Sequence, residues 1–174
     1  SGVCNIWGTK QHGHMVNVGF DTYCKLLEET VQELQGQVIE KAEPTIVDIN
    51  VTAFIPDEWV GSAEQKMIEY KRLADVKSST ELDYIVEEWT DRFAKPPECV
   101  ENLIKLIRLR LSATEVKISA IREVQDCIRI YTPYSKPELN IIQHTLPHNI
   151  SKKIKFTIAP KTCQEGASIL ILDT

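Results

Sequence analysis

Histidine and cysteine side chains are the residues of this chain best suited to catalysis or metal binding. His12 and His14 lie two positions apart in a segment that also contains Cys4. Imidazole and thiolate groups are common zinc ligands, but ligating histidines are usually oriented by a carboxylate, and this segment has none. We interpret the three residues as parts of a polar loop rather than as a metal site.

A second pair, His144 and His148, has the spacing at which two histidines of one helix can bind a metal. Pro147 lies between them, and a proline inside a helix removes a hydrogen bond and clashes with the preceding turn. The helix should therefore end before His148, and the pair should not form a joint site. One alternative stays open, in which the chain is a small soluble enzyme that uses His144 or His12 in a cleft.

Glycine-rich phosphate-binding loops are absent from the sequence. It contains neither a Gly-x-x-x-x-Gly-Lys-Ser/Thr loop nor a Gly-x-Gly-x-x-Gly turn after a predicted strand, which are the two patterns that cradle nucleotide phosphates. We therefore expect no ATP chemistry in this segment, and neither a cofactor nor a metal.

Carboxylates gather on one face of a predicted helix that begins after Ser78 and ends before Pro96. This face lies away from the apolar stripe of the helix and carries Glu81, Asp83, Glu87, Glu88 and Asp91, together with Tyr84. Two interpretations stay open. The face is either simply solvated, or it is a docking surface for an arginine-bearing partner, because carboxylates three residues apart can accept forked guanidinium hydrogen bonds.

The charge of the chain argues against a surface devoted to nucleic acid. Its net charge is −5, whereas affinity for DNA depends largely on clustered lysine and arginine. We interpret the basic residues of the predicted helices as ordinary surface residues: Lys66, Lys71, Arg72, Lys105, Arg108 and Arg110. Direct contact with DNA through residues 1–17 is kept as an alternative that the overall acidity disfavours.

The cysteines and the hydropathy pattern point to the cytoplasm. The five cysteines are scattered, odd in number and without a Cys-x-x-Cys pair, which favours reduced thiols. No apolar run approaches the roughly 20 residues that cross a bilayer, so we expect no membrane contact. The start on Ser1 and Gly2, without methionine, suggests a boundary inside a longer polypeptide.

Apolar periodicity predicts the elements of the first half. We expect an extended arm over residues 1–17, a long helix over 18–35, a half-buried strand over 47–53 and a helix over 62–76. The acidic helix follows, and a further helix begins near Pro97 and reaches Leu111. We place a domain boundary after residue 36. Residues 1–36 would then be an arm and a helix that precede the domain, and 37–174 would form the domain itself.

The second half is predicted to be richer in strands. Alternating apolar residues indicate a hairpin of strands 116–120 and 128–130 around a turn at Gln125, and a helix over 135–146 follows. Residues 154–158 alternate with lysines, as in an edge strand, whereas 169–172 are apolar on both faces, as in a central strand. The sequence therefore predicts an α/β (α+β) fold with helices packed on a small mixed sheet.

Several short motifs in order resemble the C-terminal domain of the bacterial transcription-repair coupling factors. They are NIWGTKQHGH at 5–14, VGFDTY at 18–23, IPD at 55–57, YKRLA at 70–74 and EWTDRF at 88–93, followed by Pro97. The resemblance extends from residue 4 to about residue 118. Ser1 to Cys4 depart from the Arg-Gly-Ala-Gly of the family at the corresponding place.

The resemblance implies a parent protein that is an ATP-dependent DNA translocase, displaces stalled RNA polymerase and recruits the excision-repair protein UvrA. This segment would be its regulatory, non-catalytic domain, would reach DNA only through the parent motor and would lie in the cytoplasm. In the family, the residue that matches Gln11 belongs to a motif that couples ATP hydrolysis to translocation in the adjacent motor domain.

The resemblance also assigns a role to the acidic helix. Residues that match Glu88 and Asp91 form a clasp in the family. The clasp contacts arginines of an N-terminal module similar to UvrB and covers the surface that otherwise binds UvrA. We therefore expect Glu88 and Asp91 to hold the resting protein in an autoinhibited state.

Overall fold

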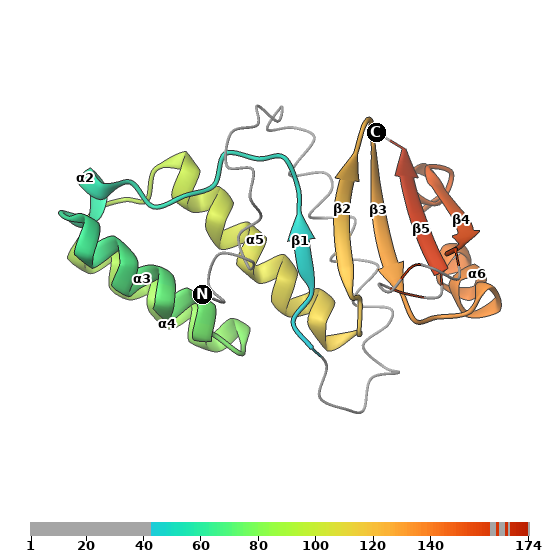
Figure 1. Ribbon diagram of the computed structural model, residues 1–174, viewed down its shortest axis with the longest axis horizontal. Coiled ribbons are helices and arrows are strands. Elements are labelled where there is room, and N and C mark those ends of the chain that lie inside the picture. Colours follow the sequence, from blue (N-terminus) through green and yellow to red (C-terminus); the bar gives the residue numbers. More distant parts are fainter. Residues whose placement is uncertain (1–42, 161–162, 164–165, 167, 174) are drawn as a thin grey trace.

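The computed structural model of the chain describes residues 43–160, 163, 166 and 168–173 (Figure 1). The expected arm, the expected helix over 18–35 and the domain boundary after residue 36 lie outside these residues. Among the helices of the described residues, none is long and apolar enough to cross a membrane.

Helices dominate the first part of the described chain, and most strands lie in the second part. The elements follow in the order β1 (Ile46–Asp48), α2 (Asp57–Val60), α3 (Ala63–Asp75), α4 (Ser79–Arg92), α5 (Glu98–Glu115), β2 (Ala120–Val124), β3 (Cys127–Thr132), α6 (Lys136–Thr145), α7 (His148–Ser151), β4 (Ile154–Ile158) and β5 (Ser168–Asp173). The predicted α/β (α+β) fold of helices on a small mixed sheet is therefore confirmed.

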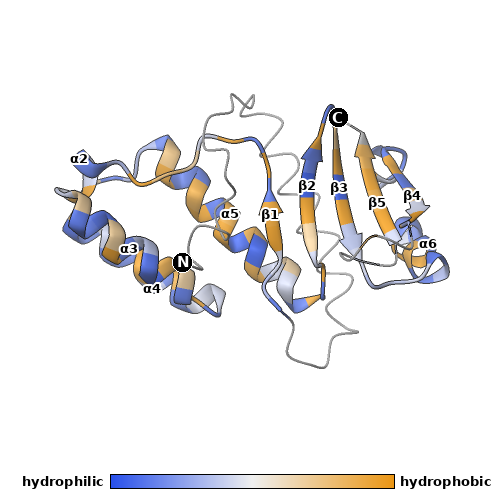
Figure 2. Cartoon of the chain, in the orientation of Figure 1, coloured by the Kyte–Doolittle hydropathy of each residue, from blue (hydrophilic) through white to orange (hydrophobic). Residues whose placement is uncertain are grey.

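The five described strands form one sheet in the order β1-β2-β3-β5-β4. β1 pairs with β2 in parallel, and the other three pairings are antiparallel. The predictions for the last two strands are confirmed, because β4 lies at an edge and β5 lies between β3 and β4. Figure 2 shows β5 mostly in the colour of hydrophobic residues, whereas β4 is mixed.

Helix α5 joins the two halves of the molecule. Its C-terminal half contributes Leu109 and Ala113 to the core between the sheet and α6. Its N-terminal half contributes Leu103 and Ile107 to a second core shared with α2, α3 and α4. Figure 1 shows α5 running between the sheet and this group of helices. Helix α5 therefore packs both on the sheet and on the helical group.

The strand expected over residues 47–53 is wrong beyond Asp48. Ile49 and Val51 are buried in the sheet core as the alternation requires, but the backbone leaves the sheet. Its polar groups find partners elsewhere: Asn102 of α5 donates to the Thr52 carbonyl at 3.1 Å, and the Phe54 N–H donates to the Cys99 carbonyl at 3.1 Å. Alternation correctly predicted burial here, but not pairing with a neighbouring strand.

The strand expected over residues 116–120 is also wrong, because these residues end α5 in a Schellman motif. The Lys117 N–H donates to the Thr114 carbonyl at 3.1 Å, and the Ile118 N–H donates to the Ala113 carbonyl at 3.0 Å. Lys117 has a φ of 61°, in the left-handed region where this motif usually has glycine. The hairpin begins only at Ala120, and its turn at Gln125 is where we expected it.

The helix caps confirm most of the expected boundaries. Ser78 accepts from the Glu81 N–H, and Ser135 with Glu138 forms a complete capping box at the start of α6. At α3 only half of the expected box forms, since Ser62 accepts from the Gln65 N–H but the Gln65 side chain turns elsewhere. Its partner there, Glu69, belongs to the candidate site.

The interior position of β5 leads to a stability prediction. Leu170 is buried and pairs with Ile130 and Phe156 in the sheet. We expect Leu170→Ala to lower the free energy of unfolding by about 2–5 kcal/mol, because a cavity remains in a packed core. The control Ile158→Ala, on the edge strand and 75% exposed, should change it by less than about 0.5 kcal/mol. Urea unfolding measures both, and equal effects would contradict the interior position of β5.

Candidate functional site

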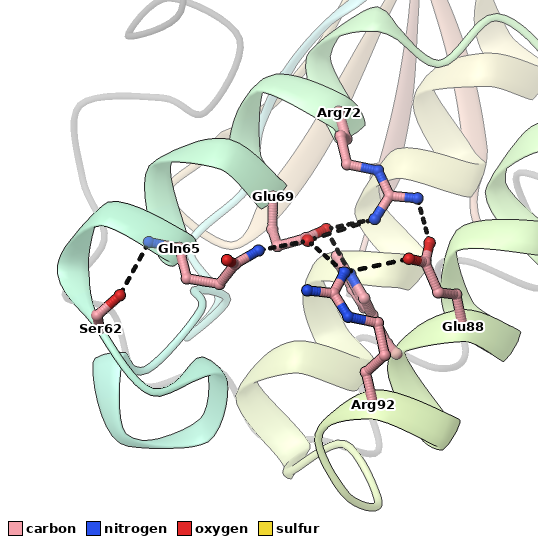
Figure 3. A network of polar contacts seen from close by, with 7 residues as sticks. Ser62, Gln65, Glu69, Arg72, Glu88 and Arg92 are labelled. Carbon is pink, nitrogen blue, oxygen red and sulfur yellow. Dashed lines mark hydrogen bonds and ion pairs between the residues drawn. The ribbon is translucent and has the colours of Figure 1, made fainter.

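Helices α3 and α4 are joined by a short loop and lie against each other. The contacts between them run in antiparallel order, because Arg72 meets Glu88 whereas the earlier Glu69 meets the later Arg92. We call the pair the α3–α4 hairpin. It carries the expected acidic face, and its inner side contains the polar contacts drawn in Figure 3.

Glu69 is fully buried at the centre of this hairpin. The indole N–H of Trp89 donates to its Oε2 at 2.7 Å, and the Arg72 guanidinium donates to the same oxygen at 2.9 Å. Its Oε1 accepts from the Gln65 amide at 3.0 Å and from Arg92 at 3.3 Å. A buried carboxylate is tolerated only when it is paired and hydrogen-bonded, and four donors meet that condition here.

Glu88 shares both arginines with Glu69. Its Oε2 accepts from Arg72, and its Oε1 accepts from Arg92 at 3.1 Å. The hydrogen bond from Arg72 holds the pKa of Glu88 below its usual value. Burial alone would lower the pKa of Arg72, but the contacts with Glu88 and Glu69 raise it on balance. We call Glu69, Arg72, Glu88 and Arg92 the arginine–carboxylate network. Its two positive and two negative charges balance.

Aromatic packing fixes the hairpin against α2. Trp59 of α2 meets Trp89 edge-on, with ring centroids 5.4 Å apart, and meets Phe93 at 5.2 Å. The Arg92 guanidinium also lies over the Phe93 ring, 4.8 Å from its centroid. The side of α4 that carries Trp89 therefore faces inward, and the opposite side faces solvent.

The five carboxylates of the acidic face are not equivalent. Asp83 pairs with Arg108 of α5 at 2.8 Å, Glu81 accepts from the Lys77 N–H at 2.8 Å, and Glu88 belongs to the network. Glu87 and Asp91 are exposed and have no hydrogen bond or ion pair within the described part of the chain. Of the two expected clasp residues, Asp91 is therefore open to a partner, whereas Glu88 already has two intramolecular ones.

Arg110 was expected on the surface and is instead 5% exposed. No carboxylate of the described residues pairs with it, and burial lowers its pKa. Its guanidinium donates to the Leu73 carbonyl at 3.4 Å, in the last turn of α3, where the helix dipole places negative charge. Arg110 thus links α5 to the C-terminal end of α3.

The two histidines of the second half are separated by the end of a helix. Helix α6 ends at Thr145 and α7 begins at His148, so His144 and His148 lie on different helices, as Pro147 predicted. The His144 ring is 2.6 Å from the carbonyl oxygen of Asn140 on its own helix. Among residues 43–160, 163, 166 and 168–173, no cluster of three potential metal ligands occurs. Gln11, His12, His14 and Cys4 lie outside the described residues.

Sequence analysis did not find Glu69 or Arg92, and it treated Arg72 as an ordinary surface residue. The apolar residues Met67 and Ile68 of α3 are exposed while their neighbour Glu69 is buried, which reverses the usual pattern. One pattern in the sequence could have indicated that Glu69 is buried. A buried tryptophan usually needs an acceptor for its N–H, and Glu69 lies on the same stripe of α3 as the buried Leu73, four residues later.

Comparison with known sequences finds relatives over most of the chain. A sequence model described as the TRCF domain matches residues 49–142. The transcription-repair-coupling factor of Bacillus subtilis (strain 168) is 30% identical over 130 residues, which are 74% of this chain and 11% of that protein. The protein of the same name from Staphylococcus haemolyticus is 32% identical over 126 residues, 70% of this chain and 11% of that protein. The chain thus spans a small part of these relatives.

The fold is also similar to that of a solved structure. The crystal structure of the C-terminal domain of transcription-repair coupling factor superposes with a TM-score of 0.56. The match covers 77% of this chain and 81% of the other, at 18% sequence identity. Because the identity is low, this similarity bears on the fold alone.

The buried position of Glu69 predicts a large effect of its removal. Glu69→Ala should lower the free energy of unfolding by about 3–5 kcal/mol, because the Trp89 N–H loses its acceptor and two arginines lose a counter-charge. The exposed Glu87→Ala is the control and should stay within about 0.5 kcal/mol. Urea unfolding followed by tryptophan fluorescence measures both. A Glu69→Ala protein as stable as the control would contradict the role of Glu69.

The lowered pKa of Glu88 predicts how stability responds to acid. A carboxyl with a lower pKa in the folded state stabilises the fold fully above its ordinary pKa of about 4.3, and this contribution is lost as the pH falls through the lowered pKa. The unaltered protein should therefore lose more stability than Glu88→Gln between pH 6 and strongly acidic pH. Urea unfolding at a series of pH values tests this, with Glu87→Gln as control. Parallel curves for the unaltered protein and Glu88→Gln would refute it.

Proposed function

The chain belongs to the TRCF domain family of the transcription-repair coupling factors, and from this premise we propose that it is the non-catalytic regulatory domain of such a protein. The parent would be an ATP-dependent DNA translocase that displaces stalled RNA polymerase and recruits UvrA. The domain would act by closing a clasp on the N-terminal UvrB-like module, which covers the surface that binds UvrA.

The observation that carries the proposal is the open carboxylate of Asp91 on the solvent side of α4. It lies three residues after Glu88, and it has no intramolecular partner among the described residues. An exposed carboxylate without a partner can accept a forked pair of hydrogen bonds from an arginine of another domain. The inner side of the same helix is fixed by Trp89 and Glu69, so Asp91 is held on a rigid support.

Glu88 limits the strength of such a clasp. Both of its oxygens already accept from Arg72 and Arg92, so an arginine of another domain must share or replace these donors. The binding free energy gained at Glu88 is the difference between the new contact with that arginine and the intramolecular contact that it replaces. This difference is small for partly exposed ion pairs. A weak clasp suits a switch, because UvrA must open it through its own higher affinity for the open state.

The remaining functional assignments also belong to the proposal. We place the domain in the cytoplasm, with Gln11 serving the adjacent motor domain and with DNA reached only through that motor. A histidine-based enzyme is not favoured, because His144 is close to a carbonyl of its own helix and His148 lies on another helix. The three described cysteines are free thiols, as the cytoplasm favours.

Charge reversal in the full-length protein tests the clasp. The double substitution Glu88→Arg with Asp91→Arg should raise the affinity for UvrA by at least about tenfold, because like charges oppose the arginines of the UvrB-like module. The control is Glu64→Arg with Glu101→Arg, an equal change of charge at two exposed positions on α3 and α5. Equilibrium binding of UvrA measures the effect. An unchanged affinity, or the same rise in the control, would overturn the proposal.

A further inference from the structure

A row of charged side chains crosses the face of the sheet that lies away from α5 and α6. Strand register places Asp48, Arg122, Arg129, Ile171 and Lys155 directly opposite one another, on β1, β2, β3, β5 and β4. Directly opposed residues share one face of a sheet, and their neighbours in sequence point to the other face. Six of these neighbours pack with α5 and α6 in the sheet core: Ile121, Ile128, Ile130, Ile154, Leu170 and Leu172. We call the face that carries the row the arginine face.

Two arginines lie directly opposite each other in this row. Like charges at opposed positions of neighbouring strands destabilise a sheet, so such a pair needs compensation. Arg122 has it, because its guanidinium pairs with Asp48 at 3.3 Å. Among the described residues, the Arg129 side chain has no partner for a hydrogen bond or ion pair, and its Nε is buried without an acceptor. A buried donor without an acceptor is costly, and a ligand that accepts from it removes that cost.

Apolar side chains are the neighbours of Arg129 on the arginine face. Ile171 lies opposite it on β5, and Cys127 and Tyr131 lie two positions before and after it on β3. Ile171 and Cys127 are half-buried, whereas Tyr131 is only 8% exposed. Strand β3 lies between β2 and β5 (Figure 1), so pairing with these strands uses its backbone N–H groups. A ligand at Arg129 would therefore meet a guanidinium and apolar side chains, without backbone donors.

These features fit a carboxylate better than a phosphate group. A carboxylate carries one negative charge and two oxygens that match the guanidinium fork, so a single arginine can neutralise and orient it. Phosphate groups usually recruit backbone N–H groups or several cations as well. Nucleic acid is disfavoured further, because Tyr131 is too buried to stack on a base and the chain has a net charge of −5.

We propose that Arg129 binds an acidic side chain from an extended segment of a partner protein, and that Ile171 and Cys127 pack against the flanking residues of that segment. The carboxylate would supply the acceptor that Nε lacks and offset the repulsion between the two opposed arginines. A free carboxylic acid would leave the apolar neighbours uncovered, whereas a protein segment covers them. The inference does not rest on the proposed clasp, because the arginine face belongs to the sheet.

Nuclear magnetic resonance titration of the 174-residue chain tests the inference. The probe is the peptide acetyl-Val-Thr-Glu-Thr-Val-amide, in which both valines point to the same side as the glutamate when the peptide is extended. It should shift the Nε–H resonance of Arg129 and saturate, with half-saturation at about 10 mM or below. The same peptide with glutamine in place of glutamate should leave this resonance unmoved, because it lacks the charge that the arginine pairs with.

Matched variants show whether Arg129 is the binding residue. In Arg129→Gln, the backbone amides of β3 and β5 should no longer respond to the glutamate peptide, and the protein should fold because a like-charge contact is removed. Arg108→Gln is the control, since Arg108 already pairs with Asp83 at 2.8 Å, and it should bind as the unaltered chain does. Binding that persists in Arg129→Gln, or equal shifts with both peptides, would overturn the proposal.

Three further probes decide what kind of ligand the site takes. N-acetyl-glutamate N-methylamide, a single blocked residue, should bind at least about fivefold more weakly than the peptide, because it lacks the two valines. Equal affinity would mean that the site takes free carboxylates and that the protein segment is wrong. Inorganic phosphate and a DNA duplex at the same ionic strength should bind more weakly than the glutamate peptide. Tighter binding of either would assign the site to phosphate groups and contradict the proposed partner.

Discussion

The buried carboxylate of Glu69 is the interaction on which the arrangement of the helical half depends. A carboxylate without water is costly unless donors surround it, and here the donors come from both helices of the hairpin. Because Trp89 must point inward to reach Glu69, the rotation of α4 about its own axis is fixed. The same rotation turns Tyr84, Glu87 and Asp91 to solvent. One buried contact therefore determines both how the hairpin packs and which surface it presents.

The rest of the fold holds this hairpin in place. Helix α5 packs on the sheet through one half and on the hairpin through the other, while Arg110 joins α5 to the end of α3. Burying an arginine without a carboxylate partner has a cost, and the carbonyl end of α3 offsets part of it. The sheet thus anchors the long helix on which the hairpin packs.

The sequence predicted the elements better than their contacts. Helices α3, α4, α5 and α6 were expected within a few residues of their bounds, because apolar spacing and serine caps are local signals. The strand expected at 47–53 ends at Asp48, and the strand expected at 116–120 begins only at Ala120. Alternating apolar residues indicate which side chains are buried, whereas strand pairing depends on residues far away in the sequence. Glu88 and Asp91 came from a family resemblance, and their role as a clasp stays a prediction. Glu69 and Arg92 could not be paired from sequence, since they lie 23 positions apart on two different helices.

Photo-crosslinking from position 84 tests most directly whether the outer surface of the hairpin meets another domain. A photoreactive phenylalanine would replace Tyr84 in the full-length protein, and the same group would replace Met67 as a control. Mass spectrometry of the irradiated protein should identify a crosslink from position 84 to an arginine-bearing segment of the UvrB-like module, and none from position 67. A crosslink from position 84 to any other part of the protein, or none at all, would contradict the account.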